Sequence, residues 1–296
     1  MVALVMPELK TVGALIVWAR QSLVRAGVSN GAQEAAWLVE HALSVRSHQL
    51  VSHADRLVSP AVQACIESLI ARRVAREPLQ YLLGTQEFCG LEFSVSPAVL
   101  IPRPETELLI HHAIEHVQRL SNSAIVDVGT GSGCVAITLA VRLKGQRILA
   151  VDRSPEALEV AQVNAMKHGV RDRIEWLEGD LLSPLQARRA AGMIDVIVSN
   201  PPYISESDWA GLEPEVRVFE PRMALVGGEQ GTEFHERLLR ESREFLVPGG
   251  VLVMEMGAGQ APIVRQLAER VGGYRALRII EDAAGIERVV IAQRME

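Results

Sequence analysis

Apolar residues recur at helical spacing through roughly the first eighty residues of the chain. Gly27 offers a C-terminal cap for the first predicted helix, and Asn30 with Gln33 forms the pattern of a capping box for the second. Ser59 and Pro60 are typical of an N-cap and a first helical turn, so they open the third. The predicted helices run over 8–26, 30–45 and 59–76. Together they predict a small helical bundle as the first domain.

Short β-type segments replace the helical pattern over 86–95. Two apolar runs flank Cys89 and Gly90, which predicts a hairpin. Prolines follow, and Pro104 is expected in the first turn of a helix that runs to about Arg119. This stretch indicates a structured connector between two domains. We expect domains at 1–84 and 104–296, joined by the connector at 85–103.

From Ala124 onward, strand-type and helix-type segments alternate. Strands are predicted over 124–128, 147–151, 173–177, 193–199, 251–256, 275–280 and 287–292. Helices are predicted over 134–143, 155–168, 232–246 and 260–271. Such alternation is typical of a mostly parallel sheet with helices on both faces. We therefore expect an α/β fold with a seven-stranded sheet.

Composition narrows the functions that the chain can have. The 296 residues are 48% hydrophobic and only 4% aromatic, so a sizeable core of aliphatic residues can be buried. The formal net charge is -6, whereas proteins that grip long stretches of nucleic acid usually carry a basic excess. The net charge therefore argues mildly against a protein that binds the phosphate backbone of nucleic acids, although it does not exclude a local basic patch.

The cysteines and the first residues indicate the compartment. Cys65, Cys89 and Cys134 lie far apart and in no metal-binding spacing, which is typical of reduced thiols in a cytosolic protein. The first residues lack the basic start and long apolar stretch of a signal peptide. The longest early apolar run, 12–19, is too short to span a bilayer. We expect a soluble, cytoplasmic protein.

A glycine-rich loop with Gly129, Gly131 and Gly133 follows the first predicted strand of the sheet. Glycine lets the backbone turn sharply and lets a ligand lie against bare main chain, and the next helix directs free N–H groups at that ligand. A dinucleotide fingerprint would need glycine in place of Cys134, and the lysine of a P-loop is absent. The loop is thus glycine-rich but fits neither phosphate-binding motif.

Two acidic residues follow the next two strands. Asp152 ends the second strand, nineteen residues after Gly133, where a carboxylate accepts hydrogen bonds from ribose hydroxyls. Asp180 follows the third strand, where it could accept from an adenine amino group. A ribose and an adenine without a pyrophosphate describe S-adenosylmethionine. The alternative is a turn-forming loop with solvated acids, which the three features in this order disfavour.

A buried-type strand runs directly into Asn200, Pro201, Pro202 and Tyr203. Ligands of open α/β sheets bind beyond the carboxyl ends of the strands, so this segment lies where chemistry would occur. Asn200 can accept from an N–H2 and donate through its own N–H2, and Pro201 adds a backbone carbonyl as a second acceptor. Pro202 stiffens the turn, and Tyr203 can stack on a flat group.

These residue types suit an acceptor nitrogen that is planar and poorly nucleophilic, as in an amide or an exocyclic base amine. With both N–H bonds held, its lone pair can be aimed at a sulfonium methyl, so catalysis can be mostly orientation. No separate general base is evident. The alternative is a proline-rich turn after a strand, which the flanking asparagine and tyrosine disfavour.

Several motifs together resemble the release factor glutamine methyltransferases (the PrmC/HemK family), among the class I methyltransferases that act on amide or exocyclic nitrogens. The likeness covers nearly the whole chain, including the helical first domain. It is carried by residues 78–84, 101–107, 127–133, 200–203, 219–221 with 224–225, and 284–290.

The resemblance implies a class I methyltransferase (Rossmann-like) fold, with S-adenosylmethionine as methyl donor. The acceptor would be the side-chain nitrogen of the glutamine in the Gly-Gly-Gln motif of class I peptide chain release factors, contacted by the N-terminal helices. Cofactor-binding positions would be Asp127, Gly129, Thr130, Gly131, Ser132, Gly133, Asp152, Asp180, Leu181 and Asn200. Leu181 stands where the family often has an aromatic residue, so apolar packing is expected instead of stacking. The substrate would contact Arg103, Asn200, Pro201, Pro202 and Tyr203, of which Asn200, Pro201 and Tyr203 would be catalytic.

Two other functions fit part of the pattern. A nucleic-acid base N-methyltransferase, acting on adenine N6 or guanine N2, would stack a flipped base on Tyr203. The acidic balance and the lack of a separate basic domain disfavour it. A non-catalytic cofactor-binding adaptor is disfavoured by the intact Asn200–Tyr203 segment. We expect no stable nucleic-acid partner and a monomer.

Three further groups of polar or charged residues are not assigned to the predicted site. The histidines at 111–116 include a pair one helical turn apart but no third ligand, so no metal is expected. The basic run at 72–76 is interpreted as a solvated helix face, with a partner contact as the less favoured alternative. Arg217 and Glu220 could close over the substrate or hold their loop in place.

Overall fold

The computed structural model describes residues 11–45, 47–118, 120 and 122–296. The chain divides into two compact units. The first extends to Gly84 and also contains the later segment Pro214–Phe219. The second contains Thr85–Glu213 and Glu220–Glu296. Each unit is stabilised by hydrophobic packing of its own side chains.

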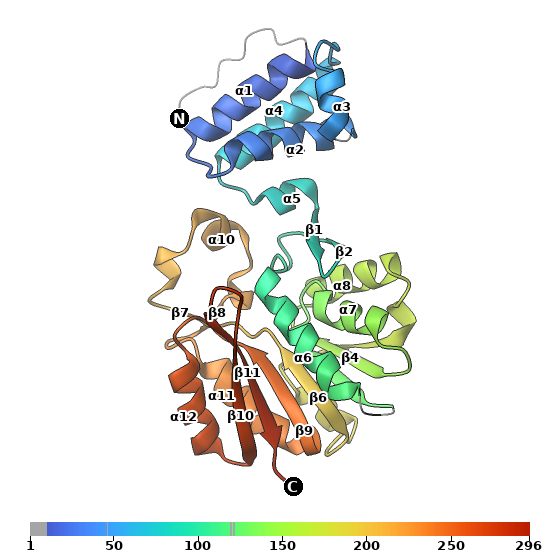
Figure 1. Ribbon diagram of the computed structural model, residues 1–296, viewed down its shortest axis with the longest axis vertical. Helices are drawn as coiled ribbons and strands as arrows, with labels where there is room; N and C mark the ends of the chain where they lie inside the picture. The colour runs from blue at the N-terminus through green and yellow to red at the C-terminus, as the bar shows by residue number, and fades with distance from the viewer. Residues whose placement is uncertain (1–10, 46, 119, 121) are drawn as a thin grey trace. The chain divides into compact units, whose positions relative to one another are not determined.

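Helices form the N-terminal part of the first unit, blue to cyan in Figure 1. Their apolar faces enclose a core that includes Leu15, Leu38 and Ile70, all fully buried. The helices are α1 (Val12–Arg25), α2 (Gly31–Leu43), α3 (Ser47–Ser52), α4 (Pro60–Val74) and α5 (Leu79–Leu83). The predicted bundle is confirmed, although the short α3 and α5 were not predicted. The predicted start of α1 at residue 8 lies outside the described residues.

Two predictions about this unit are wrong. The side chain of Asn30 does not cap α2, because its ψ of 29° departs from the extended conformation in which a capping side chain reaches the first turn. Arg73 does not lie on a solvated face. Its buried Nε is 2.6 Å from Glu34 Oε2, and its Nη1 is 2.9 Å from Glu215 Oε1. A buried guanidinium needs such partners, and only tertiary packing selects which arginine turns inward.

The predicted hairpin and the helix after it are confirmed. Cys89 and Gly90 both have positive φ, 54° and 80°, as a two-residue turn between twisted strands requires. The strands are β1 (Thr85–Phe88) and β2 (Leu91–Ser94), and the helix comprises η1 (Pro104–Thr106) and α6 (Glu107–Val117). Pro104 opens this helix with a single 3-10 turn, because its φ suits a first turn and its missing N–H would have no partner there.

Seven strands form the predicted sheet, in the order β10-β11-β9-β6-β3-β4-β5 (Figure 1). β11 runs antiparallel to both of its neighbours, β10 and β9, and the other neighbouring strands pair in parallel, so the sheet is mostly parallel, as expected. The strands are β3 (Ala124–Val128), β4 (Arg147–Asp152), β5 (Ile174–Glu178), β6 (Ile194–Ser199), β9 (Leu246–Glu255), β10 (Tyr274–Glu281) and β11 (Glu287–Arg294). The parallel strands place the ends of β3, β4, β5 and β6 at one edge, where the predicted site residues follow them.

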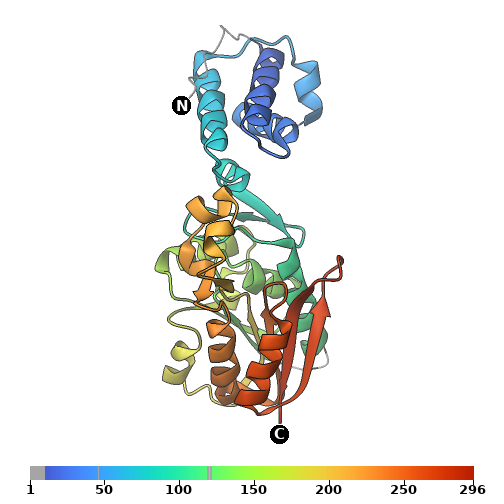
Figure 2. The ribbon, with the colours of Figure 1, turned by 90° about the vertical axis from the view of Figure 1, so that its left-hand side faces the viewer.

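Helices cover both faces of the sheet, and Figure 2 shows the layers after a turn of 90°. Residues of α6, α7 and α8 pack against one face, whereas residues of α9, α11 and α12 pack against the other. These helices are α7 (Cys134–Arg142), α8 (Pro155–Lys167), α9 (Ser183–Ala187), α11 (Glu233–Phe245) and α12 (Ala261–Val271). The near-continuous apolar strands are explained by this burial on both sides.

The segment after Tyr203 contains short elements that hydrophobic periodicity did not predict. They are β7 (Ile204–Ser205), η3 (Trp209–Gly211), α10 (Pro214–Phe219), η4 (Arg222–Ala224) and β8 (Val226–Gly228). Elements of two to six residues are too short to show a period. Among the described residues, no helix combines the length and the apolar character needed to cross a membrane.

Candidate functional site

The loop after β3 turns at three glycines with positive φ: Gly129 at 73°, Gly131 at 54° and Gly133 at 81°. At Gly133 a side chain is excluded for a second reason, since a Cβ would lie 2.8 Å from Ile137 Cδ1 and 3.0 Å from Ala161 Cβ. The loop can therefore pass close to α7 and α8 and present its main chain.

Asp127 lies beneath this loop and is almost fully buried. Its Oδ2 accepts hydrogen bonds from Thr130 Oγ1 at 2.6 Å and from the Ala136 N–H at 3.1 Å. Burial raises the pKa of this carboxyl to about 7, although both hydrogen bonds act in the opposite direction. Asp127 thus ties the loop to the first turn of α7, and its contact with a cofactor stays a prediction.

Asp152, at the end of β4, holds the same loop from the other side. Its Oδ2 accepts from the Gly131 N–H at 2.8 Å, and its Oδ1 accepts from the Ser154 N–H at 3.0 Å. Burial raises the pKa of Asp152, against the effect of these bonds. Each carboxylate oxygen has a further lone pair, so the two can also accept from a pair of hydroxyl groups.

Asp180 and Leu181 follow β5 at the edge of the site. The exposed Asp180 carboxylate is paired with Arg237 of α11, whose Nη2 lies 2.7 Å from Oδ2. Leu181 is buried, with an unusual φ of 48° for a leucine. Arg237 was not predicted as part of the site, because its position 57 residues downstream gives no indication of this pairing.

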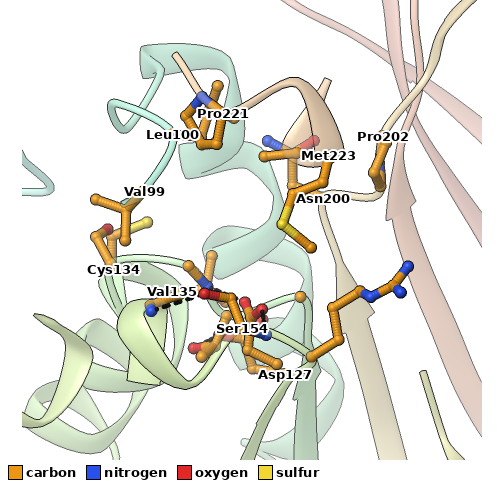
Figure 3. A pocket seen from close by; sticks show the side chains of 18 of the residues that line it. Val99, Leu100, Asp127, Cys134, Val135, Ser154, Asn200, Pro202, Pro221 and Met223 are labelled. Carbon is orange, nitrogen blue, oxygen red and sulfur yellow. Dashed lines mark hydrogen bonds between the residues drawn. The ribbon is translucent and has the colours of Figure 1, made fainter. Parts of the chain in front are cut away.

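These elements surround a pocket of about 1010 Å³, counted with its open mouth. The predicted residues in its wall are Arg103, Asp127, Gly129, Thr130, Gly131, Ser132, Asp152, Asp180, Leu181, Asn200 and Pro202. Gly133, Pro201 and Tyr203 are not in the wall. In Figure 3, Asn200 and Met223 lie toward one end of the pocket, and Val99 and Cys134 toward the other. The apolar wall formed by Val99, Leu100, Pro221, Met223 and Phe234 was not predicted.

The side chain of Asn200 is held by residues far away in the chain. Asn200 Nδ2 donates to Thr106 Oγ1 at 3.1 Å, and Thr106 Oγ1 donates to Glu255 Oε2 at 2.7 Å. The Tyr203 hydroxyl donates to Glu255 Oε1 at 3.2 Å. Thr106 lies in a stretch that carries the family resemblance, whereas nothing in the sequence singled out Glu255.

Burial governs the protonation of this cluster. Glu255 is only 1% exposed, and burial raises the pKa of its carboxyl to about 7. Burial and the neighbouring Glu255 also raise the pKa of Tyr203 well above its usual range, so the phenol keeps its proton. That hydroxyl is therefore a donor to Glu255, and the stacking role of Tyr203 stays a prediction.

Arg103 reaches the pocket beside the loop after Tyr203. Its Nη2 lies 2.5 Å from Oε1 of the buried Glu220, whose Oε2 accepts from the Ile101 N–H at 3.1 Å. Glu220 thus holds its loop in place, the second of the two roles considered for it. The contact of Arg103 with a substrate stays a prediction.

The histidines of α6 lie outside this pocket. Ligand atoms of His111, His112 and Glu115 lie within 4.8 Å of one another, and His112 Nδ1 is 3.1 Å from Glu115 Oε2. A third possible ligand, Glu115, thus lies beside two of the histidines, so the prediction that none is nearby is wrong, and the absence of a metal stays a prediction. Cys65, Cys89 and Cys134 are free thiols, as expected.

Two protein families match successive parts of the chain. Residues 14–84 match the PrmC N-terminal domain, and residues 104–211 match the methyltransferase small domain. The first match covers the chain from residue 14 of α1 to the end of α5, and the second covers β3 to β6 together with the glycine loop and the Asn200–Tyr203 segment.

Curated relatives match over almost their full length. A release factor glutamine methyltransferase of Geobacter sulfurreducens is 42% identical, over 96% of this chain and 97% of its own. One of Moorella thermoacetica is 41% identical over 93% and 95% of the two chains. One of Nitratidesulfovibrio vulgaris is 40% identical over 96% and 95%.

Solved structures share the fold at low sequence identity. The hMettl16 catalytic domain, in complex with MAT2A 3'UTR hairpin 6, has a TM-score of 0.56 and 17% identity, over 76% of this chain and 81% of that one. The N-terminal domain of human METTL16, in complex with SAH, has a TM-score of 0.50 and 20% identity, over 76% and 82%. Such likeness shows a shared methyltransferase fold and carries no statement about substrate.

Proposed function

The chain belongs to the release factor glutamine methyltransferase family, and from this premise we propose that it methylates a glutamine side chain at its amide nitrogen, N5. The glutamine is that of the Gly-Gly-Gln motif in class I peptide chain release factors, and the reaction modulates translation termination. One observation carries the proposal: the Asn200 amide stands in the pocket wall with its N–H2 side bound to Thr106. Its carbonyl oxygen is thereby left for the N–H2 of an acceptor amide.

The pocket suits S-adenosylmethionine as methyl donor. The glycine loop leaves room for a ligand against its main chain, and Asp152 has lone pairs for two ribose hydroxyls. The exposed Asp180 and the buried Leu181 supply a polar and an apolar contact for an adenine. When bound, the donor supplies a methyl group on a sulfonium, which is already a strong electrophile.

The chain's own residues contribute orientation. Asn200 Oδ1 and the Pro201 carbonyl accept the two N–H bonds of the glutamine amide, so its nitrogen lone pair is aimed at the methyl group. Orientation of this kind can supply roughly 7–11 kcal/mol of a barrier. On transfer, the nitrogen would gain the methyl group as the methyl–sulfonium bond breaks, S-adenosylhomocysteine would leave, and the surplus amide proton would pass to water. Tyr203 and Arg103 would help to hold the substrate.

The remaining assignments follow from the same proposal. The helical domain at 1–84 recognises the release factor, the hairpin connector spans 85–103, and the methyltransferase domain spans 104–296. The enzyme acts as a cytoplasmic monomer and forms no stable complex with nucleic acid. The net charge of -6 supports the last point.

Incubation with S-adenosylmethionine and a class I release factor tests the function. Mass spectrometry of the tryptic peptides should show one added methyl group on the Gly-Gly-Gln peptide. A release factor with that glutamine replaced by alanine is the control and should stay unmodified. Parallel reactions with DNA and RNA should stay unlabelled, and label found only in nucleic acid would contradict the proposal.

A further inference from the structure

Three segments that are distant in the chain meet behind the Asn200 side chain. Thr106 comes from η1, Glu255 ends β9, and Tyr203 belongs to the motif itself. The register of the sheet explains part of this meeting, since Ser199 of β6 pairs with Met254 of β9. Asn200 and Glu255 are therefore the next residues of two adjacent parallel strands, and both are carried to the same edge.

The direction of each hydrogen bond can be assigned from donor and acceptor capacity. Above about pH 7, where the Glu255 carboxyl is ionised, it only accepts, so the Thr106 hydroxyl donates its single hydrogen to Oε2. Thr106 Oγ1 then has only lone pairs for Asn200, and the contact at 3.1 Å must come from the N–H2 side of the amide. The Asn200 carbonyl oxygen consequently faces away from Thr106.

This assignment matters because the two ends of a side-chain amide have nearly the same shape. Packing alone distinguishes them poorly. A hydroxyl that already donates its only hydrogen elsewhere can only accept, so it binds the N–H2 end of the amide and not the carbonyl end. In the reverse orientation, Asn200 would place two N–H donors toward the acceptor amide, which needs a carbonyl there. The bonding partners of Thr106 therefore decide whether Asn200 can accept.

Glu255 itself is firmly held. His235 of α11 is fully buried, and its Nε2 lies 2.8 Å from the Glu255 backbone carbonyl. Burial lowers the pKa of His235 to about 4, so the ring is neutral and its N–H donates to that carbonyl. Through Oε1 the same carboxylate receives the Tyr203 hydroxyl at 3.2 Å. One buried group thus fixes both ends of the Asn200–Tyr203 segment.

We propose that Thr106 and Glu255 are positioning residues that select the Asn200 amide orientation in which Oδ1 accepts from the substrate N–H2. Neither group needs to touch the acceptor for this role: Thr106 lines the pocket, whereas Glu255 does not. The proposal rests on the proposed function, because it assumes an acceptor nitrogen that donates two hydrogens. It adds a source of specificity for amide acceptors that the Asn200–Tyr203 segment does not contain by itself.

Thr106→Val is the direct test, because it removes the hydroxyl and nearly keeps the shape. We expect kcat for release factor methylation to fall on the order of 10- to 100-fold, as for other misplaced catalytic contacts. The affinity for S-adenosylmethionine, measured by calorimetry, should stay within about twofold, because the loop and Asp152 are untouched. Thr106→Ser keeps the hydroxyl and should recover most of kcat.

Thr138→Val is the matched control for loss of a buried hydroxyl. Thr138 is fully buried on α7, and its Oγ1 donates to the Cys134 carbonyl at 2.6 Å, within the helix. This variant should keep kcat while losing a comparable amount of thermal stability. An equal fall of kcat in Thr138→Val and Thr106→Val would overturn the proposal, as would normal turnover by Thr106→Val.

Glu255→Gln tests the role of the carboxylate that accepts from Thr106 and Tyr203. Glutamine has one acceptor oxygen for the two hydroxyls that Glu255 now accepts, so kcat should fall here as well. In a cycle with Thr106→Val, the joint loss should be smaller than the product of the single losses, because both act through one amide. Multiplicative losses would mean that the two residues act independently.

A measurement without turnover separates this proposal from the proposed function. In an amide NMR spectrum, the Asn200 side-chain pair is identified by its absence in Asn200→Ala. One of its protons should exchange slowly in the native protein and in Thr106→Ser, and quickly in Thr106→Val. If the release factor is not methylated but this protection is found, the proposed function fails and the network stands. If methylation occurs without the protection, the network is wrong.

Discussion

The cofactor end and the acceptor end of the pocket are held together differently. At the cofactor end, the bonds that hold the glycine loop join residues of that loop or of neighbouring strands, as between Asp127 and Thr130 and between Gly131 and Asp152. At the acceptor end, Asn200 bonds to Thr106, which lies 94 residues earlier in the chain. One end is thus organised locally, and the other depends on the assembled sheet.

Because of this difference, we expect the cofactor end to determine the affinity for the methyl donor and the acceptor end to determine the orientation of the acceptor nitrogen. The cofactor end offers carboxylate and main-chain groups whose contacts determine how tightly a donor is bound. The acceptor end offers one amide whose value lies in its orientation, and orientation acts on the rate rather than on donor affinity. Substitutions at the two ends should therefore change different quantities.

Asn200→Ala should produce the largest effect and is the sharpest test of that separation. Without the amide, the acceptor nitrogen is no longer oriented toward the methyl group. We therefore expect kcat to fall about 1000-fold, roughly 4 kcal/mol. Donor affinity by calorimetry should change less than about threefold. A parallel loss of donor affinity would show that the two ends are not separable.

Asp127→Asn examines the cofactor end through stability. The pKa of the Asp127 carboxyl is about 7 in the folded chain and 3.8 in the unfolded chain. The free energy of unfolding is therefore highest below pH 3.8 and falls as the pH rises from 3.8 to about 7, because only the unfolded chain ionises readily in that range. Asparagine cannot ionise and can keep both hydrogen bonds, so the variant should be more stable than the native chain at about pH 8, by up to roughly 4 kcal/mol. At about pH 4 the advantage should vanish.

Chemical denaturation of the two proteins at both pH values gives this comparison. Asp172→Asn is the control, because Asp172 has a side chain that is 97% exposed. Its stability difference from the native chain should not depend on pH in this way. A pH-independent difference for Asp127→Asn would contradict the burial argument.

Asp152→Ala should weaken donor binding by about 1–3 kcal/mol, the value of one or two hydrogen bonds. The loop also loses its bonds from Gly131 and Ser154 to this carboxylate. Once the donor is saturating, kcat should recover to within a few-fold of the native value. Asp152→Asn keeps one carbonyl acceptor and should lose less; unchanged affinity in both variants would refute the ribose assignment.

Arg237→Gln should have the smallest effect. Its pair with Asp180 is partly exposed, and exposed ion pairs contribute about 0.2–1 kcal/mol, less at high salt. We expect donor affinity to change less than about fivefold, with Asp180→Ala the more harmful change if Asp180 contacts the adenine. Arg270→Gln breaks a pair with Glu236 in which the arginine is more exposed, outside the pocket, and serves as the control for calorimetry.

Local pattern was sufficient for most of the fold. The strands of the sheet and its longer helices follow from apolar runs and alternation, and the bounds of β3 at Ala124–Val128 agree with the prediction, whereas the five-residue α9 was not predicted. The pattern failed between Tyr203 and β8, where elements of two to six residues have no measurable period. It also failed at Asn30, because a capping motif needs a backbone angle that composition does not dictate.

The sequence by itself determined which groups stand at the ends of the parallel strands: the glycine loop, Asp152, Asp180 and the Asn200–Tyr203 segment. It did so because each of them follows a recognisable strand, and parallel strands end at one edge. Only the tertiary structure decided that Arg73 turns inward and that Asp180 faces Arg237. The tertiary structure also decided the orientation of the Asn200 amide. That orientation depends on Thr106 and Glu255, which are brought together only when the sheet is assembled.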